Sequence, residues 1–141
     1  MKTITPDGWP RPRGYAHGIA ARGTLVFVSG QIGWDEQQRF VSDDLAGQVR
    51  RALENVVAIV AAAGGRPEDV TRLTWYVLDK HAYVGASAAI GEAYRAVMDK
   101  HFPAMSVVEV SALVEDRALV EIEATAVVPD ERAAAPESSA Q

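Results

Sequence analysis

The sequence predicts an α+β protein with one domain, in which a β-sheet carries two helices on a single face. A chain of 141 residues, 48% of them hydrophobic, can bury one ordinary core but is short for two domains. The predicted elements follow the order strand, helix, strand, helix, strand, strand. Alternation of apolar and polar side chains in the last two strands provides an apolar sheet face that the helices can cover.

The first two predicted elements are a strand over residues 24–30 and a long amphipathic helix. The run TLVFVSG is rich in β-branched and aromatic residues and closes on a glycine, which is typical of a strand. The helix follows Ser42 and Asp43, which can cap its N-terminus, and ends at Gly64-Gly65. Its apolar residues recur at the spacing of one helical face, namely at Leu45, Val49, Leu53, Val56, Val57 and Val60.

The second strand and the second helix are predicted between residue 70 and Pro103. Residues 70–79 form another β-rich run. The helix that follows ends before Pro103, because proline cannot continue a helix. The apolar stripe of this helix comprises Tyr83, Ile90, Tyr94, Val97, Met98 and His101.

The last two strands, over 105–113 and 119–128, are joined by a polar turn and have two different faces. The apolar class, which we expect to face the helices, comprises Val108, Val110, Ala112, Val120, Ile122, Ala124 and Ala126. The mixed class comprises Met105, Val107, Glu109, Ser111, Leu113, Leu119, Glu121, Glu123, Thr125 and Val127. A half-apolar open face favours self-association over a monomer whose glutamates are simply solvated.

The two ends of the chain are expected to lie outside the fold. The prolines of residues 1–13 predict an extended or irregular N-terminal segment. Residues 129–141 lack apolar periodicity, and we expect them to form a disordered tail. The domain itself is predicted over residues 14–128.

Charge, cysteine content and hydropathy disfavour several classes of function. Nineteen acidic and 14 basic residues give a net charge of −5, which opposes the phosphate neutralisation on which nucleic-acid binding depends. The chain has no cysteine, so thiolate metal sites and thiol nucleophiles are excluded. The spacing of His17, His81 and His101 does not fit a metal site. The N-terminus is polar and no run of about 18 apolar residues occurs, so we expect a cytoplasmic protein without a membrane partner.

Five sequence blocks within residues 14–128 occur together in a characteristic order and spacing. They are GYAHG, VFVSGQIG, QVRRALENVVAIVAAAGG, FPAMSVVEV and LVEIEATAV. This set is similar to that of the Rid (YjgF/YER057c/UK114) family. The resemblance implies a chorismate-mutase-like sheet with two helices on one face, in homotrimers that bind a small molecule in clefts between subunits. It also implies a deaminase chemistry without metal or cofactor, in which an arginine binds the substrate carboxylate and a strand glutamate positions a water.

The position of that arginine is changed in this sequence. In deaminating members of the family the arginine lies in a P-A-R-S block, which here reads PAMS over residues 103–106, with Met105 in its place. A thioether cannot make the bidentate contact that holds a carboxylate. The position that is usually cysteine is Val107, and an asparagine common before the second helix's tyrosine is Gly91. The resemblance therefore implies a cleft of the Rid type that is more apolar.

Other positions match the family's functional residues. Glu121 matches the strand glutamate that orients water and is the candidate catalytic residue, with an exposed or inter-subunit structural role as the alternative. Tyr15 matches the tyrosine of the N-terminal block and could donate to a ligand, or pack in an interface. Gly30 and Gln31 match the family's S-G-Q-I turn. The complete set of candidate ligand-binding residues is Tyr15, His17, Gly30, Gln31, Trp34, Met105 and Val107.

Two members of this set, His17 and Trp34, rest on weaker arguments. His17 lies two residues after Tyr15 and could supply a base near neutral pH, although a lone histidine is usually structural. Trp34 follows the glycine turn and could form a pocket wall, although packing is its commoner role. Arg13 immediately precedes the Gly14-Tyr15 block and could replace the missing guanidinium.

Two functions are consistent with these residues. The first is a cofactor-independent hydrolase or deaminase acting on an imine, enamine or ring-derived metabolite, which the presence of Glu121 and Tyr15 favours. The alternative is a non-catalytic small-molecule-binding or regulatory trimer, which Met105 and Val107 favour. We favour the hydrolase, while the sequence leaves the identity of the ligand open.

Overall fold

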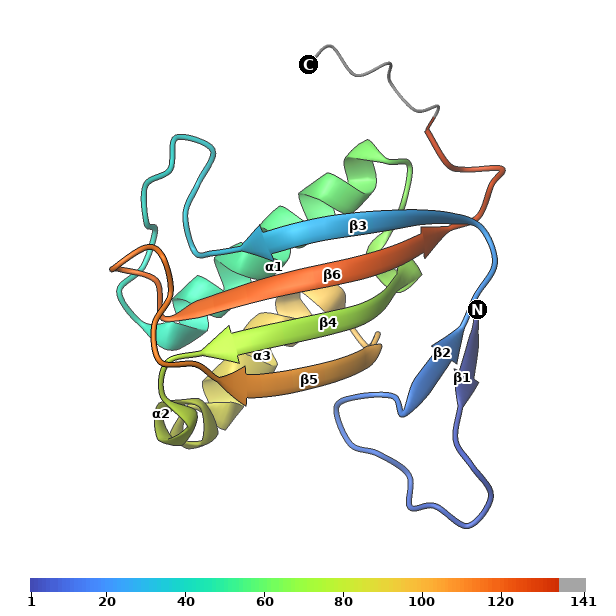
Figure 1. The fold of residues 1–141 in the computed structure, drawn as a ribbon, viewed down its shortest axis with the longest axis horizontal. Coiled ribbons are helices and arrows are strands. Elements are labelled where there is room, and N and C mark those ends of the chain that lie inside the picture. The colour runs from blue at the N-terminus through green and yellow to red at the C-terminus, as the bar shows by residue number, and fades with distance from the viewer. Residues whose placement is uncertain (135–141) are drawn as a thin grey trace.

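A mixed four-stranded sheet forms the centre of the protein in a computed structural model, which describes residues 1–134 (Figure 1). Its strands lie in the order β3 (Thr24–Gln31), β6 (Val120–Val128), β4 (Val70–Val77) and β5 (Ala104–Glu109). Strand β6 runs antiparallel to both β3 and β4, whereas β4 and β5 are parallel. The last strand of the sequence therefore lies inside the sheet.

Two long helices, α1 (Leu45–Ala62) and α3 (Ser87–Met98), cover one face of this sheet and lie behind it in Figure 1. This arrangement confirms the predicted α+β fold. The region predicted as one continuous second helix is divided, because a short helix α2 (Lys80–Gly85) precedes α3. A 3-10 turn, η1 (Pro67–Asp69), leads into β4.

The core lies between the helices and the sheet, and β6 contributes to it as predicted. Val120, Ile122, Ala124 and Ala126 are all buried. These side chains pack with an apolar stripe from α1 and with residues of β4 and α3. The fully buried members include Val49, Leu53, Val56, Val60, Val70, Leu73, Val77 and Met98.

Strand β5 contradicts the predicted assignment of its two faces. Its register pairs Met105 with Leu73, which is buried in the core. Side chains at paired positions of adjacent strands point to the same face, so Met105 and Val107 lie on the helix face. Val108, predicted to face the helices, lies on the other face and is 43% exposed. The strand is apolar at both parities and lies at the edge of the sheet, so alternation could not orient it.

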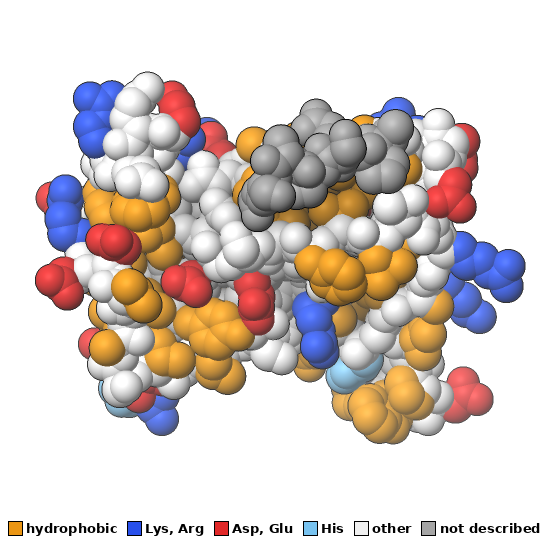
Figure 2. All heavy atoms as spheres, turned by 45° about the horizontal axis from the view of Figure 1, so that its top comes forward, with side chains coloured by type: hydrophobic (Ala, Val, Ile, Leu, Met, Phe, Trp, Pro, Cys, Tyr) orange, Lys and Arg blue, Asp and Glu red, His pale blue; other side chains and the backbone are white. Residues whose placement is uncertain are grey.

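The face of the sheet that the helices leave uncovered mixes apolar and polar side chains. On β3, Leu25 is 57% exposed and Phe27 is 75% exposed. We call this surface the open sheet face; its residues are Leu25, Phe27, Arg72, Thr74, Tyr76, Ser106, Val108, Glu121, Glu123, Thr125 and Val127. Figure 2 shows hydrophobic side chains interspersed with acidic ones on the surface seen there. The mixture predicted for the second face of β6 is thus present.

Both ends of the chain contain more structure than expected. Residues Lys2–Ile4 form strand β1, which pairs antiparallel with β2 (Gly18–Ala20) in a separate two-stranded sheet. Residues 129–134, part of the expected tail, lie against the body of the protein through Arg132 and the amide of Ala134. The remainder of the expected tail lies outside the described residues. No helix within residues 1–134 is long and apolar enough to cross a membrane.

Candidate functional site

The predicted site residues lie in separate parts of the structure. Tyr15 and His17 lie in the N-terminal segment, which runs beside the start of β5. The amide of Ala16 donates to the carbonyl of Pro103 at 3.0 Å, and Ala16 forms an isolated parallel bridge with Ala104. These contacts hold the N-terminal segment beside the block that contains Met105.

Gly30 and Glu121 meet at the junction of β3 and β6. A Cβ atom at Gly30 would lie only 2.2 Å from Oε2 of Glu121, so the glycine leaves the space in which the carboxylate lies. Gln31 does not point to this carboxylate, because its Nε2 donates to the carbonyl of Ser29 at 3.2 Å. The structure therefore brings together two of the predicted residues, Gly30 and Glu121.

Glu121 differs from its neighbour on the open sheet face. Glu123 accepts a 2.6 Å hydrogen bond from the hydroxyl of Tyr76, and this bond raises the pKa of Tyr76. Within residues 1–134, the carboxylate of Glu121 has no hydrogen-bond or ion-pair partner. A half-buried carboxylate with free acceptor oxygens can bind and deprotonate a water molecule.

Tyr15 and His17 belong to an aromatic group at the surface. The ring of His17 makes edge-to-face contacts with Trp9 at 5.0 Å and with Tyr15 at 5.5 Å between ring centroids. Tyr15 remains 41% exposed. The contacts of His17 are thus aromatic packing contacts, which is the structural role that the sequence left open.

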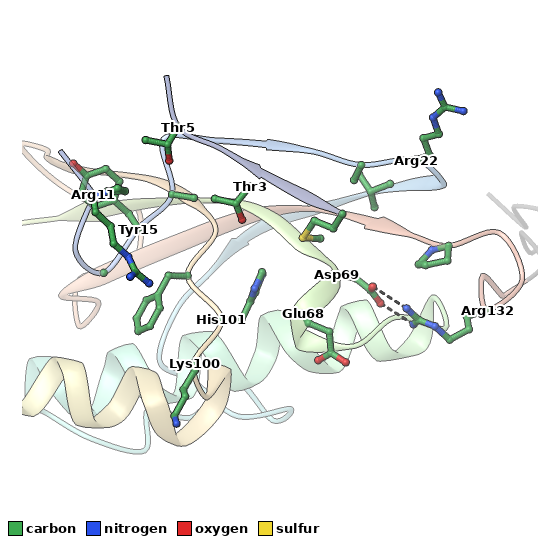
Figure 3. Close-up of a pocket in the computed structure, with 18 residues that line it drawn as sticks. Thr3, Thr5, Arg11, Tyr15, Arg22, Glu68, Asp69, Lys100, His101 and Arg132 are labelled. Atoms are coloured by element: carbon green, nitrogen blue, oxygen red, sulfur yellow. Dashed lines mark hydrogen bonds and ion pairs between the residues drawn. The ribbon is translucent and has the colours of Figure 1, made fainter. Parts of the chain in front are cut away.

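A cavity of about 620 Å³ lies between the N-terminal segment and the body of the protein (Figure 3). Tyr15 and Arg11 line one side, and His101 and Lys100 lie near its floor. On the far side from Tyr15, Asp69 accepts two hydrogen bonds from Arg132 at 2.8 and 2.9 Å, which lower the pKa of Asp69. Glu121 does not line this cavity.

A second cavity, of about 330 Å³, lies between α3 and the start of β5. We call it the aromatic cavity; its lining residues are Gly14, Trp75, Tyr83, Ser87, Ile90, Gly91, Tyr94, Arg95, Phe102 and Met105. Tyr94 stacks between Trp75 and Phe102, with ring centroids 6.2 and 5.2 Å apart. Burial raises the pKa of both Tyr83 and Tyr94, so these phenols are neutral near pH 7.

The sequence did not reveal this cavity. Trp75 lies in the predicted strand over residues 70–79, and Tyr83 and Tyr94 belong to the predicted helical stripe. Trp75 and Tyr94 are buried and Tyr83 is half-buried, yet these rings surround a space. The alternation assigned Met105 to the opposite face of the sheet, so the sequence carried no signal that Met105 and these rings line one cavity.

The other predicted residues lie outside both cavities. Trp34 packs against Phe40 at 5.9 Å, and its carbonyl accepts a hydrogen bond from Asn55. It also lines two further surface pockets, so its role in a pocket wall stays a prediction. Val107 is 38% exposed on the edge strand β5. Arg13 is exposed and lines neither cavity.

Met105 and Glu121 lie on opposite faces of the sheet. Met105 pairs with Leu73 on the helix face, whereas Glu121 pairs with Tyr76 on the open face. Three residue steps along β4 separate these pairing positions, which corresponds to about 10 Å. A single chain therefore does not bring Glu121 and the aromatic cavity together. Within residues 1–134, no group of three His, Asp or Glu side chains is arranged to hold a metal ion.

The fold and these residues define an α+β protein with a two-helix layer, an open sheet face and an aromatic-lined cavity at the edge strand. Residues 10–128 match the family model described as Endoribonuclease L-PSP. The chain belongs to this family, which is the Rid family, as the sequence blocks predicted.

Individual proteins are similar over almost the whole chain. The 2-iminobutanoate/2-iminopropanoate deaminase of Salmonella typhimurium is 39% identical over 130 residues, covering 89% of this chain and 97% of that protein. The crystal structure of the Rid-family protein YyfB from Yersinia pestis has a TM-score of 0.80 at 30% identity, covering 90% of this chain and 98% of that one. The YjgF structure from E. coli has a TM-score of 0.64 at 37% identity, with coverages of 90% and 98%.

Proposed function

We propose that this protein is a deaminase that hydrolyses 2-imino acids to 2-oxo acids and ammonia. The similarity to deaminases of the Rid family supports this reaction class. The observation that carries the proposal is the free carboxylate of Glu121 beside Gly30. It provides a base without a partner among the described residues, held on the open sheet face in the space that Gly30 leaves.

The reaction needs one water molecule and one group that moves a proton. Glu121 accepts a proton from water as the water oxygen adds to the imine carbon, and the former C=N bond becomes a C–N single bond. Glu121 then returns the proton to the nitrogen of the tetrahedral intermediate. Glu121 next takes the hydroxyl proton of this intermediate and transfers it to the amino nitrogen. The C–N bond then breaks, ammonia leaves, and the oxygen forms the new carbonyl group. A positioned carboxylate contributes about 10²–10⁴-fold to such a step.

We further propose that the complete site forms between subunits of a homotrimer. Glu121 and the aromatic cavity lie on opposite faces of one sheet, so a substrate can contact both only where two chains meet. The exposed Phe27 and Leu25 on the open sheet face are suited to burial against another subunit. Small-molecule sites commonly lie at such interfaces.

The proposal is tested by ammonia release from freshly generated 2-imino acids. We expect the parent protein to accelerate this release and Glu121→Gln, which keeps the shape but removes the base, to lose about 10²-fold or more in kcat. Equal rates for the parent and Glu121→Gln would contradict the role of Glu121.

The alternative function is a non-catalytic trimer that binds a small molecule. It is favoured by Met105, which places a thioether where a deaminase of this family holds the substrate carboxylate. This alternative predicts no ammonia release by the parent protein and a gain in Met105→Arg. The same assay therefore separates the two functions.

A further inference from the structure

Arg95 is a cation at the wall of the aromatic cavity. It follows Gly91 by one turn of α3, and a Cβ atom at Gly91 would lie 3.2 Å from Nη1 and 3.8 Å from Nη2 of Arg95. Gly91, Arg95 and Met105 all line the cavity. The missing side chain at position 91 thus provides the space beside the guanidinium.

This guanidinium is available to a ligand. Arg95 is exposed, and within residues 1–134 its side chain forms no ion pair and donates no hydrogen bond. Arginine side chains bind carboxylates through two parallel hydrogen bonds, which fix both position and orientation. Arg95 therefore has the chemistry that Met105 lacks, at the same cavity.

Trp75, one of the residues that line the cavity, carries a buried donor without a partner among the described residues. Trp75 is 2% exposed, and its Nε1 has no hydrogen-bond partner among the described residues. Buried donors are nearly always paired, so an unpaired one indicates a missing partner. The rings of Trp75, Tyr94 and Phe102 offer stacking surfaces, and the sulfur of Met105 is suited to contact with an aromatic ring.

We propose that Arg95 binds the substrate carboxylate and that the aromatic cavity receives an aromatic substrate side chain. The substrate class is then a 2-imino acid whose aromatic side chain packs against the rings that line the cavity. This inference rests on the proposed deaminase function and specifies its substrate. The cavity volume of about 330 Å³ lies within the range of small-molecule sites, about 300–1,000 Å³, and a methyl side chain would leave most of it unfilled.

Binding is tested with phenylpyruvate, a stable 2-oxo acid, and pyruvate as the small counterpart, both by calorimetry. We expect phenylpyruvate to bind at least about tenfold more tightly than pyruvate, and Arg95→Gln to weaken phenylpyruvate binding by about tenfold or more. Arg50→Gln on α1 is the matched control, because Arg50 is also an exposed helical arginine and does not line the cavity. Equal affinity for the two acids, or unchanged binding in Arg95→Gln, would overturn the inference.

Turnover separates this inference from the proposed function. Imines are generated from phenylalanine and from alanine, and ammonia release is measured for the parent protein and Arg95→Gln. We expect a higher kcat/KM for the phenylalanine imine and a raised KM in Arg95→Gln. Hydrolysis of the alanine imine without any effect of Arg95→Gln would overturn the anchor and leave the deaminase function intact. In the opposite case, neither imine is hydrolysed but phenylpyruvate still binds, and its binding still depends on Arg95. This result would overturn the deaminase function and support the proposed class of ligand.

Discussion

Single side chains in this protein carry distinct tasks that depend on what surrounds them. Glu121 and Glu123 are two residues apart on one face of the same strand, yet the hydroxyl of Tyr76 donates a hydrogen bond only to Glu123. The difference leaves Glu121 as the carboxylate free for chemistry. Gly30 and Gly91 act in the same way as each other, since each provides space for a functional group of a neighbouring residue.

The pair formed by Asp69 and Arg132 gives a pH-dependent contribution to stability. The hydrogen bonds from Arg132 lower the pKa of Asp69 below its ordinary value of 3.8. A lowered folded-state pKa stabilises the protein at pH values above the unfolded-state pKa, and this contribution is lost as the pH falls through the folded-state value. We expect Arg132→Ala to cost about 1–3 kcal/mol near pH 7, because Asp69 is buried.

The difference between the parent and Arg132→Ala should disappear in acid. Urea unfolding measured between pH 7 and pH 2 checks this, and we expect the two free energies of unfolding to converge below about pH 4. Arg22→Ala is the control, because Arg22 lines the same cavity without an ion pair among the described residues. A constant difference down to the lowest pH would contradict the assignment.

At the residue scale, the sequence identified two neighbouring residues but not the cavity. Glu121 and Gly30, each matched separately to the family, are adjacent in the structure, and their role in catalysis stays a prediction. Arg95 carried no signal, because an arginine on an exposed helical face is common. Its significance depends on Gly91 and on the cavity beside it, and both are properties of the folded chain.

Among the elements, the short helix α2 is stabilised by its N-terminal cap more than by the burial of its side chains. None of its residues is buried, and the carboxylate of Asp79 accepts hydrogen bonds from the amides of His81 and Ala82 at 2.9 and 3.1 Å. The helix also carries Tyr83 to the wall of the aromatic cavity. The cap thus determines how firmly one wall of the cavity is held.

We expect Asp79→Ala to lower the local stability of α2 by about 0.5–2 kcal/mol, because two amides lose their acceptor. Hydrogen exchange of the His81 and Ala82 amides measures this local opening. Asp79→Ser is the control, since serine also caps helices and should retain most of the protection. Unchanged exchange in Asp79→Ala would show that packing alone holds α2.

The elements themselves were predictable where the hydrophobic period was clear. The stripe of α1 and the alternation of β6 each bury one face, and both predictions are confirmed by the core. Strand β5 was oriented wrongly, because an edge strand with apolar residues at both parities has no preferred face until its neighbour fixes the register. Strands β1 and β2 were missed because three-residue strands carry almost no periodic signal.

In the whole molecule, the proposed inter-subunit site makes activity a property of two chains together. Subunits with Glu121→Gln keep Arg95, and subunits with Arg95→Gln keep Glu121. When both variants are co-expressed with different tags, some sites combine the two intact halves. We expect the randomly assembled population to recover about a quarter of the parental activity on the phenylalanine imine, since random association pairs intact halves in about one site in four.

Two controls define this experiment. Each variant assembled alone should stay near background, and mixing the purified variants without subunit exchange should restore nothing. Light scattering of the mixed species gives the oligomeric state that the proposal requires to be a trimer. If the activity of the mixed oligomers never exceeds that of the separate variants, Glu121 and Arg95 do not act together in a site between two chains. This result would contradict the proposed inter-subunit site.

The central position of β6 also determines when the protein can fold during its synthesis. Because β6 is synthesised after β3, β4 and β5 and lies between β3 and β4, the earlier strands cannot close the sheet without it. In a nascent chain that ends before residue 120, the facing edges of β3 and β4 have no partner and the sheet lacks the apolar side chains of β6. We therefore expect productive folding of this sheet to begin only after residues 120–128 have been synthesised, and a chain terminated before them to be a substrate for chaperones and proteases.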